Sequence, residues 1–228
     1  MTRNIIAIRP GPALSETLEM ARDTGMSVTG IALSQAKSCQ WEAPEPADYD
    51  AILAGSANAF RHGGNQLDAL KSLPVMAVGE QTAKAARDAG FAVSHIGTGG
   101  LQGLIDALDD TPRRLLRISG KDHVALTWPD HITFDTQIVY QMEALPLSYG
   151  DAETLKAGAI ILLFSASSAA HFWLECERLN VPHSAVTVAA LGPRIAAAAG
   201  DGWRAVHTAA NPSTAELLAL AQQLWQLK

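Results

Sequence analysis

The segment AILAGSANAF at residues 51–60 sets a pattern that runs through the whole chain: four apolar residues, a turn of small and polar residues, and the start of a helix. The segment ILLFSASSAA at residues 161–170 repeats this pattern. A short apolar run bounded by a turn is typical of a strand buried on both faces. The two segments therefore predict the same strand–turn–helix unit in each half of the chain.

A second pair of segments extends the repeat. AVGEQTAKAA at residues 77–86 is similar to ALGPRIAAAA at residues 190–199, and each follows its strand–turn–helix unit in the same order. Each half then continues with a glycine-containing helix end, a short strand and a closing helix. Each copy thus contains three strands alternating with three helices, which is typical of a parallel sheet covered by helices on both faces.

Apolar strand-like runs alternate with stretches of helical period along the rest of the chain. The predicted strands are residues 5–8, 28–33, 51–54, 75–78, 93–96, 115–118, 137–140, 160–164, 186–190 and 205–207. The clearest predicted helices are residues 13–24, 82–89, 101–108, 169–178 and 214–227.

Each copy needs two more strands to make a five-stranded doubly wound domain, and residues 5–33 and 115–140 can supply them. Because neighbours in sequence tend to pair, we expect 115–140 to join the copy before it. Strand 5–8 must then pair with 160–164 and not with 51–54. The resulting prediction is an α/β protein of two doubly wound, flavodoxin-like parallel-sheet domains, joined by a two-segment linker around an interdomain cleft. Domain 1 is residues 1–34 and 146–228, domain 2 is 48–142, and the linkers are 35–47 and 143–145.

Composition excludes several classes of protein. Of the 228 residues, 48% are hydrophobic and 18% are charged, which excludes a disordered chain. The 17 Lys and Arg residues against 23 Asp and Glu residues give a formal charge of −6, which argues against a nucleic-acid or membrane binder. The longest apolar run, 159–164, is too short to cross a bilayer. Residues 1–10 read as a strand entering a turn, with no signal-peptide pattern, so we expect a cytoplasmic protein. Separately, we expect a monomer.

Common catalytic and metal-binding motifs are missing from the sequence. Cys39 and Cys176 are isolated and are interpreted as ordinary thiols, and the seven histidines are scattered, so no metal site is predicted. There is no G-x-S-x-G elbow and no phosphate-binding P-loop, and the glycines at 97–100 lack the rest of a dinucleotide fingerprint. Hydrolase and nucleotide-binding functions are therefore disfavoured.

The order and spacing of several short motifs across the whole chain resemble the uroporphyrinogen-III synthase family. These motifs are Arg9-Pro10, Ser56-Ala57-Asn58-Ala59, Val78-Gly79-Glu80-Gln81-Thr82-Ala83, Ser119-Gly120-Lys121, Val139-Tyr140-Gln141, Phe164-Ser165-Ala166-Ser167 and Leu191-Gly192-Pro193-Arg194-Ile195-Ala196. The chain departs from the family pattern at Gly55, where a threonine is common, and at Arg194-Ile195, where a Thr-Thr pair is frequent. A hydroxyl contact is therefore lost at Ile195, whereas Thr82 keeps one in the other copy.

The resemblance implies an enzyme that closes the linear tetrapyrrole hydroxymethylbilane to uroporphyrinogen III, with loss of water and inversion of one ring, in porphyrin and heme biosynthesis. The implied small-molecule substrate is a flexible polycarboxylate, and no metal or organic cofactor is required, because the pyrrole supplies the electrons. The protein chiefly supplies orientation and an acid for the leaving hydroxyl. The alternative is a non-catalytic, two-lobed small-molecule-binding protein, which would share both domains and the cleft.

The turns that follow the strands are the candidate substrate-binding positions, because backbone N–H groups at helix N-termini hold carboxylates. They comprise Arg9, Ser56, Ala57, Asn58, Gly79, Thr82, Ser119, Gly120, Lys121, Ser165, Ala166, Ser167, Gly192 and Arg194. The other interpretation is that the Ser and Asn residues are helix caps and that Gly79 and Gly192 form tight turns, strained by a bulky residue where φ is positive.

Tyr140 is the candidate catalytic acid. It ends a predicted strand, and a phenol is protonated at neutral pH and can donate to a departing hydroxyl. A tyrosine in a strand is also a common cross-strand packing residue, and the sequence leaves that alternative open. Five cations lie in or beside the turns and could pair with substrate carboxylates or remain solvated charges at helix starts: Arg9, Arg61, Lys84, Lys121 and Arg194.

Overall fold

The computed structural model describes residues 4–226 and forms two compact units. Unit 1 contains residues 4–35 and 144–226, and unit 2 contains residues 36–143. The first three residues of the expected N-terminal strand and turn lie outside the described residues, as does Leu227 at the end of the last expected helix.

Unit 1 is built on a five-stranded parallel sheet with the strand order β11-β10-β9-β1-β2. Its elements are β1 (Asn4–Ile8), α1 (Ala13–Asp23), β2 (Val28–Ile31), α5 (Tyr149–Lys156), β9 (Ala159–Leu163), α6 (Ala166–Arg178), the 3₁₀ helix η3 (His183–Ala185), β10 (Val186–Ala190), α7 (Pro193–Ala198), β11 (Ala205–Thr208) and α8 (Thr214–Gln226). The predicted pairing of β1 with β9 is confirmed, because Ile5 lies opposite Ile160 in the register.

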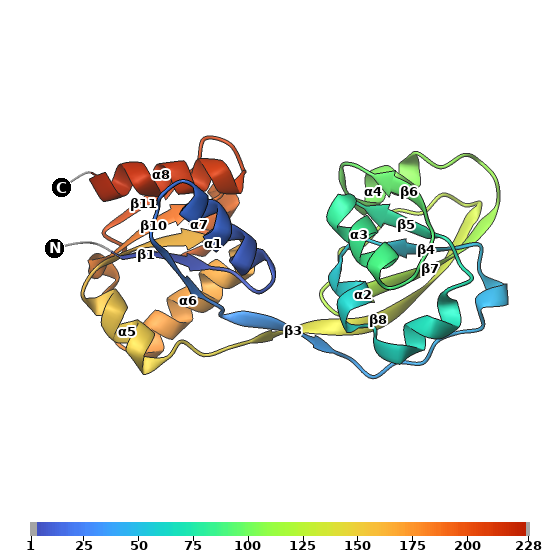
Figure 1. The fold of residues 1–228 in the computed structure, drawn as a ribbon, viewed down its shortest axis with the longest axis horizontal. Helices are drawn as coiled ribbons and strands as arrows, with labels where there is room; N and C mark the ends of the chain where they lie inside the picture. Colours follow the sequence, from blue (N-terminus) through green and yellow to red (C-terminus); the bar gives the residue numbers. More distant parts are fainter. Residues whose placement is uncertain (1–3, 227–228) are drawn as a thin grey trace. The chain divides into compact units, whose positions relative to one another are not determined.

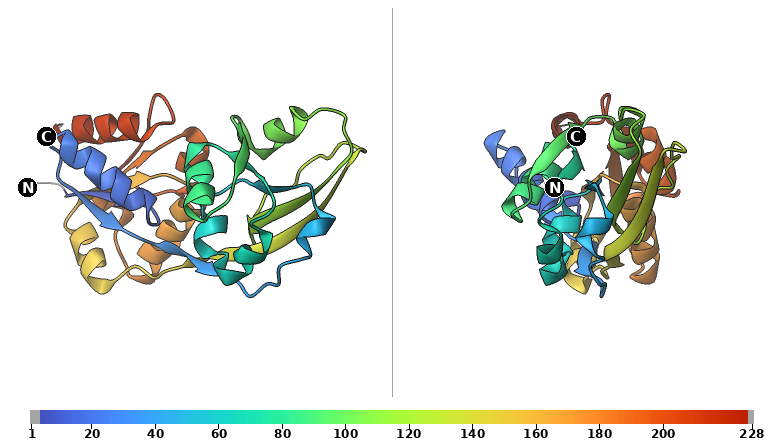
Figure 2. Two further views of the ribbon diagram at one scale, coloured as in Figure 1. Left: turned by 45° about the vertical axis from the view of Figure 1, so that its right-hand side comes forward. Right: turned by 90° about the vertical axis from the view of Figure 1, so that its right-hand side faces the viewer.

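Helices cover both faces of this sheet (Figures 1 and 2). On one face, α5, α6 and α7 pack on the strands around Phe172, Leu155 and Ile161. On the other face, α1 and α8 pack around Ala21, Leu217 and Ile160. The central strands are buried on both faces, which explains why their sequence is continuously apolar rather than alternating.

Unit 2 has a six-stranded sheet with the order β3-β8-β7-β4-β5-β6. Its elements are β3 (Ser34–Ser38), the 3₁₀ helix η1 (Pro46–Asp48), β4 (Ala51–Ala54), α2 (Asn58–His62), the 3₁₀ helix η2 (Gly64–Leu70), β5 (Val75–Val78), α3 (Glu80–Asp88), β6 (Val93–Gly97), α4 (Gly100–Asp106), β7 (Arg113–Gly120) and β8 (Ile132–Ala144). Helices α2, η2 and α3 pack on one face and α4 on the other.

Strand β3 corrects the sequence-based prediction of five strands for this unit. Residues 35–47 were expected to be a linker, but Ser34–Ser38 forms an edge strand beside β8. Backbone N–H groups of Leu145 and Cys39 donate to the carbonyls of Leu33 and Val139, so the two strands run in opposite directions. Polar side chains give β3 no apolar alternation, and that is why its sequence does not signal a strand. That domain 1 (1–34 and 146–228) and domain 2 (48–142) fold independently of each other stays a prediction.

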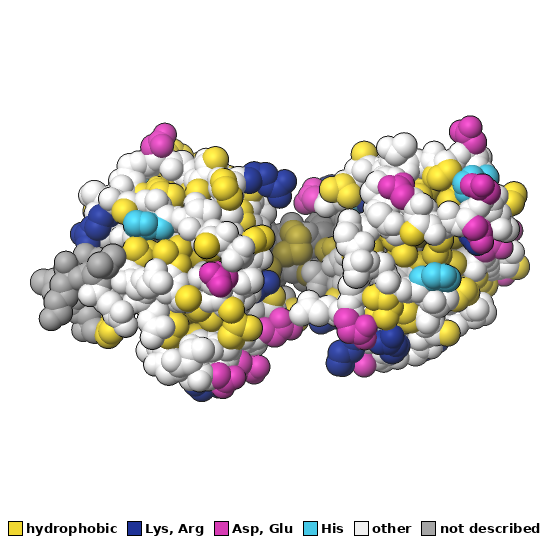
Figure 3. Space-filling model, turned by 90° about the horizontal axis from the view of Figure 1, so that it is seen from above, with side chains coloured by type: hydrophobic (Ala, Val, Ile, Leu, Met, Phe, Trp, Pro, Cys, Tyr) yellow, Lys and Arg dark blue, Asp and Glu magenta, His cyan; other side chains and the backbone are white. Residues whose placement is uncertain are grey.

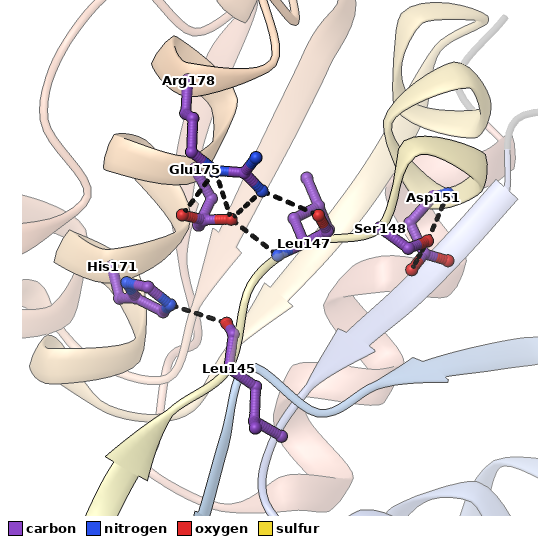
Figure 4. Close-up of polar contacts among 7 residues, drawn as sticks. All are labelled: Leu145, Leu147, Ser148, Asp151, His171, Glu175 and Arg178. Atoms are coloured by element: carbon purple, nitrogen blue, oxygen red, sulfur yellow. Dashed lines mark hydrogen bonds and ion pairs between the residues drawn. The ribbon is translucent and has the colours of Figure 1, made fainter.

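The return segment at residues 145–148 is fixed to α6 (Figure 4). Glu175, which is 7% exposed, accepts the backbone N–H of Leu147 at 2.6 Å, and the Arg178 guanidinium donates to both the Glu175 carboxylate and the Leu147 carbonyl. One ring nitrogen of His171 lies 2.8 Å from the Leu145 carbonyl oxygen. The chain is thus hydrogen-bonded immediately before Ser148 caps α5.

On the face drawn in Figure 3, Lys and Arg side chains of the described residues are mixed with Asp and Glu and do not gather into one basic patch. No helix among residues 4–226 is both long and apolar enough to span a membrane.

Candidate functional site

In unit 1, three neighbouring strands end level at the carboxyl edge of the sheet. The last residue of β9, Leu163, is paired with Ala190 of β10 on one side and with Ile8 of β1 on the other. The chain leaves β1 for β2 on one side and β9 for β10 on the other, so the strand order reverses between β1 and β9. Such a switch point is where open α/β sheets bind ligands, and the residues that follow the three strands are Arg9, Ser165 and Gly192.

Arg9 is held at this switch point by α1, by α8 and by the residue that follows β9. Its Nη1 donates to the Thr17 hydroxyl of α1 at 3.0 Å and to the Thr214 hydroxyl of α8 at 3.4 Å, and its guanidinium lies 4.6 Å from the centre of the Phe164 ring. Burial lowers the pKa of Arg9 from its usual value, while Glu16 opposes this change. The side chain is a half-buried, oriented cation that suits a carboxylate ligand.

The N-terminus of α6 carries the serine-rich turn. The Ser165 hydroxyl oxygen accepts the backbone N–H of Ser168 at 3.2 Å, so Ser165 caps the helix. This agrees with the interpretation that the serines of these turns are helix caps. Its hydroxyl also lies 2.9 Å from the Ser168 hydroxyl and 3.3 Å from that of Ser167. The first N–H groups of a helix have no partner inside the helix, so the backbone at Ala166 and Ser167 can bind an anion.

Gly192 corrects the sequence-based view of its turn. Its φ is −166°, an extended conformation open to any residue, and a Cβ at this position would have no atom within 4 Å. The strain expected there for a bulky residue is therefore absent. Arg194 is exposed on α7, which is only six residues long and so has a weaker dipole than α6.

In unit 2, an equivalent edge lies between β4 and β7. The end of β4 at Ala54 is paired with Ala77 of β5 and Ile118 of β7, and the strand order reverses between β4 and β7. The residues that follow or end these strands are Ser56, Gly79 and Gly120. The sequence-predicted candidates of this unit therefore meet at one edge of its sheet.

The turns after β4 and β5 differ in how they begin the next helix. The Ser56 hydroxyl accepts the backbone N–H of Asn58 at 3.2 Å at the start of α2, whose N-cap is the buried Ala57. Gly79 has a φ of +76°, which favours glycine, and it caps the nine-residue α3. Thr82 is 4% exposed within α3, so its hydroxyl lies inside the unit and not at the surface.

Tyr140 lies beside the end of β7. It is paired with Gly120, its carbonyl accepts the backbone N–H of the exposed Lys121 at 2.9 Å, and its ring centre is 6.3 Å from that of His62. Ser119 precedes this pair and is half-buried. Burial lowers the pKa of His62, and the charge of Arg61 lowers it further. A phenol and an imidazole therefore stand together next to the carboxyl edge of unit 2.

The described residues 4–226 also include cysteines, side chains of the metal-binding types and Lys84. No cluster of three or more His, Cys, Asp or Glu side chains there could hold a metal ion. Cys176 is buried in unit 1, and burial raises the pKa of its thiol to about 12, so it is unreactive at neutral pH. Lys84 is paired with Asp88 on the surface of α3.

Four residues of these edges were not identified from the sequence. Thr17 and Thr214 fix Arg9, Phe164 lies under its guanidinium, and His62 faces Tyr140. A buried threonine on the apolar face of the 13–23 helix and a threonine at a helix start are weak signals. Only the fold shows that they meet at Arg9, because Thr214 is 205 positions away from it.

Comparison with known proteins gives one family and one fold. A family model described as Uroporphyrinogen-III synthase HemD matches residues 22–219. The crystal structure of uroporphyrinogen-III synthetase from Helicobacter pylori 26695 superposes with a TM-score of 0.67 at 20% identity, over 97% of this chain and 99% of that chain. A mutant uroporphyrinogen III synthase from the extremely thermophilic bacterium Thermus thermophilus gives a TM-score of 0.47 at 14% identity, over 97% and 98% of the two chains. A search among curated proteins found no match.

Proposed function

The chain belongs to the uroporphyrinogen-III synthase family, and from that membership we propose which residues perform the reaction. The enzyme is a cyclising lyase of porphyrin and heme biosynthesis. It closes hydroxymethylbilane to uroporphyrinogen III, with loss of water and inversion of one ring. Family membership therefore favours the enzyme over the non-catalytic binding protein.

The reaction needs two things from the protein. The substrate is flexible and carries many carboxylates, so it must be held in one conformation for the correct carbon of the last ring to attack. The leaving hydroxyl must also be protonated, because hydroxide is a poor leaving group. Loss of water gives a cationic azafulvene, and the family chemistry continues through a spiro intermediate that fragments and recloses.

We propose that the carboxyl edge of each unit binds substrate carboxylates. In unit 1 the binding groups are Arg9, the α6 turn at 165–167, Gly192 and Arg194. In unit 2 they are the turn at 56–58, Gly79, and the segment Ser119-Gly120-Lys121, whereas the buried Thr82 is left out. One observation supports this assignment: in both units, neighbouring strands end at the same level, beside the point where the strand order reverses. Among these groups, α6 combines a long helix with the oriented Arg9 on the neighbouring strand, so we expect the tightest binding there.

We further propose that Tyr140 is the general acid. Its O–H bond breaks as the proton moves to the hydroxyl oxygen of the substrate, the C–O bond breaks, and water leaves. The half-buried phenol at the end of the β7–β8 pair supports this role, because it is near the edge that carries the carboxylate-binding turns of the same unit.

The activity itself is tested by incubating the protein with hydroxymethylbilane and separating the ring isomers. We expect the isomer with the inverted ring. Exclusive formation of the isomer without inversion, at the rate seen without protein, would contradict the assignment.

The role of Tyr140 is tested by Tyr140→Phe, which removes only the hydroxyl. We expect turnover to fall by up to about 100-fold, the low end for a general acid, since water can replace the phenol in part. Tyr149→Phe is the matched control, because Tyr149 is 78% exposed on α5. Unchanged turnover in a normally folded Tyr140→Phe variant would leave Tyr140 as a packing residue.

We also propose that the enzyme acts as a monomer. We further propose that it works in the cytoplasm, which is consistent with a biosynthetic enzyme acting on a small molecule. Light scattering during size-exclusion chromatography tests the first point, with an expected mass of 24.1 kDa. A mass of twice this value at the assay concentration would contradict it.

A further inference from the structure

The pairing of β7 with β8 contains an irregularity directly beside Tyr140. Ser119 is paired with Ile138, but Gly120 is paired with Tyr140, so Val139 is skipped in the register. Val139 is buried in the core between the sheet and helices α2 and α3, and the Tyr140 ring packs against the same core. Successive side chains of a regular strand point to opposite faces, whereas a bulge allows two neighbours to share one face.

The space for the Tyr140 ring exists because residue 120 is a glycine. A Cβ at this position would lie 2.6 Å from Cζ and 2.9 Å from the hydroxyl oxygen of Tyr140. Gly120 is not among the glycines with a positive φ, so its backbone does not require glycine. Ordinary carbon contacts are about 3.5 to 4.0 Å, and the ring would therefore have to move by about 1 Å to accommodate an alanine.

We infer that Gly120 and the bulge at Val139 together position the Tyr140 phenol for proton transfer. The bulge turns the ring to the α2–α3 face, and Gly120 lets it lie flat against the end of β7 with its hydroxyl at the sheet edge. Gly120 is a positioning residue in this role, because it acts through Tyr140. The inference rests on the proposed function of Tyr140 as the general acid.

The first test is Gly120→Ala in the full-length enzyme, with turnover and KM measured separately. A displacement of about 1 Å at a reacting group costs up to about 100-fold in rate, so we expect kcat to fall by about 10- to 100-fold. KM should change less than about 3-fold, because an alanine keeps the backbone N–H groups proposed to bind a carboxylate at residues 119–121. Gly103→Ala is the matched control, because Gly103 is exposed on α4 of the same unit and its Cβ would meet only the Thr98 carbonyl oxygen at 3.4 Å. Equal kcat values for Gly120→Ala and wild type would overturn the inference.

A combined variant shows whether Gly120 acts through the hydroxyl. In a Tyr140→Phe background the hydroxyl is already gone, so Gly120→Ala should cause little further loss of kcat. A further loss as large as in the wild-type background would overturn the inference. If Gly120→Ala prevents folding, Tyr140→Ala should restore it in the double variant by removing the clashing ring. Failure of that rescue would equally count against the ring contact.

A structural readout separates this inference from the role of Tyr140 as an acid. The His62 ring lies 6.3 Å from the Tyr140 ring, so its NMR signals report the position of that ring. They can be assigned by their loss in His62→Gln. We expect Gly120→Ala to shift them and Gly103→Ala to leave them in place. If Tyr140→Phe keeps full activity while Gly120→Ala still shifts the His62 signals, the acid role fails and the ring contact stands. Unshifted signals would overturn the positioning role.

Discussion

Gly79 and Gly192 occupy corresponding positions in the internal repeat but differ in their backbones. Gly79 has a φ of +76°, whereas Gly192 has a φ of −166°. A valine at position 79 must adopt a conformation that costs about 1 to 3 kcal/mol, and a valine at position 192 has no such cost. We therefore expect Gly79→Val to lower the melting temperature and Gly192→Val to leave it unchanged.

The activity of the same two variants tests the carboxylate-binding turns. A Cβ at Gly192 would meet no atom within 4 Å, so the valine side chain would occupy the space through which a carboxylate approaches the backbone. Gly192→Val should therefore raise KM at an unchanged melting temperature. Unchanged KM for this folded variant would remove Gly192 from the proposed binding surface.

Tyr140 and Arg9 were predictable from the sequence, but the contacts that orient them were not. The apolar run at 138–140 does not reveal which two of its residues share a face, because a bulge leaves no mark in the pattern. Similarly, the partners of Arg9 are Thr17 and Thr214, which meet it only after the sheet has brought β1 beside β9. Residue types were thus predictable, whereas orientations depended on the three-dimensional register.

At the scale of elements, α6 has its cap and its proposed ligand-binding groups in the same turn. Ser165→Ala removes the hydroxyl that accepts the Ser168 N–H, and losing such a cap costs about 1 kcal/mol. The backbone N–H groups proposed to bind substrate stay where the fold places them. We therefore expect a lower melting temperature and retained activity. Complete inactivation with an unchanged melting curve would show that the side chain, and not the backbone, carries the function.

The contact between α6 and the return segment predicts a pH dependence of stability. Hydrogen bonds from Arg178 are the main cause that lowers the pKa of Glu175, against the opposing effect of burial. When folding lowers the pKa of a carboxyl group, the group stabilises the fold fully at any pH above its pKa in the unfolded chain, which is about 4.3 for Glu. This contribution is lost as the pH falls toward the pKa in the folded protein. Arg178 is 44% exposed, so solvent screens part of the pair.

Glu175→Gln tests this contribution, because it keeps an oxygen for the Leu147 N–H but removes the charge. We expect the free energy of unfolding to fall by about 1 kcal/mol at pH 7, and the difference from wild type to shrink below about pH 4. Glu153→Gln is a suitable control, since its pair with Lys156 is exposed. A difference that stays constant over this pH range would contradict a role for the Glu175 charge.

Elements with a strong apolar pattern were predicted well, and those without one were missed. The observed β4, β5 and β10 have the predicted bounds, and β9 differs by one residue at each end, because all four are buried strands with continuous apolar sequence. Strand β3 and helix α5 were not predicted, since the first is polar and the second shows only a weak apolar face. Strand β8 is longer than expected because its exposed parts carry polar residues that do not read as a strand.

At the scale of the whole molecule, unit 2 is a single continuous stretch of chain inserted between the two parts of unit 1. Its cores lie on the two faces of its own sheet, so it contains what a domain needs to fold alone. The sequence placed this domain at 48–142, which omits β3 and Trp41. Trp41 is 9% exposed in the α2–α3 core, and its indole N–H donates to the Gly63 carbonyl at 2.8 Å.

Two fragments therefore should behave differently. We expect residues 33–145 to unfold cooperatively, because this fragment keeps the β3–β8 pair and Trp41. Residues 48–142 should be unfolded or much less stable, since losing a buried tryptophan alone costs about 3 to 5 kcal/mol and small domains have only about 5 to 15 kcal/mol. Thermal melting and the dispersion of amide NMR signals distinguish the two, and Trp41→Ala in the longer fragment should give an intermediate stability. If both fragments melted at the same temperature with equal cooperativity, the segment before β4 would be the dispensable linker that the sequence first suggested.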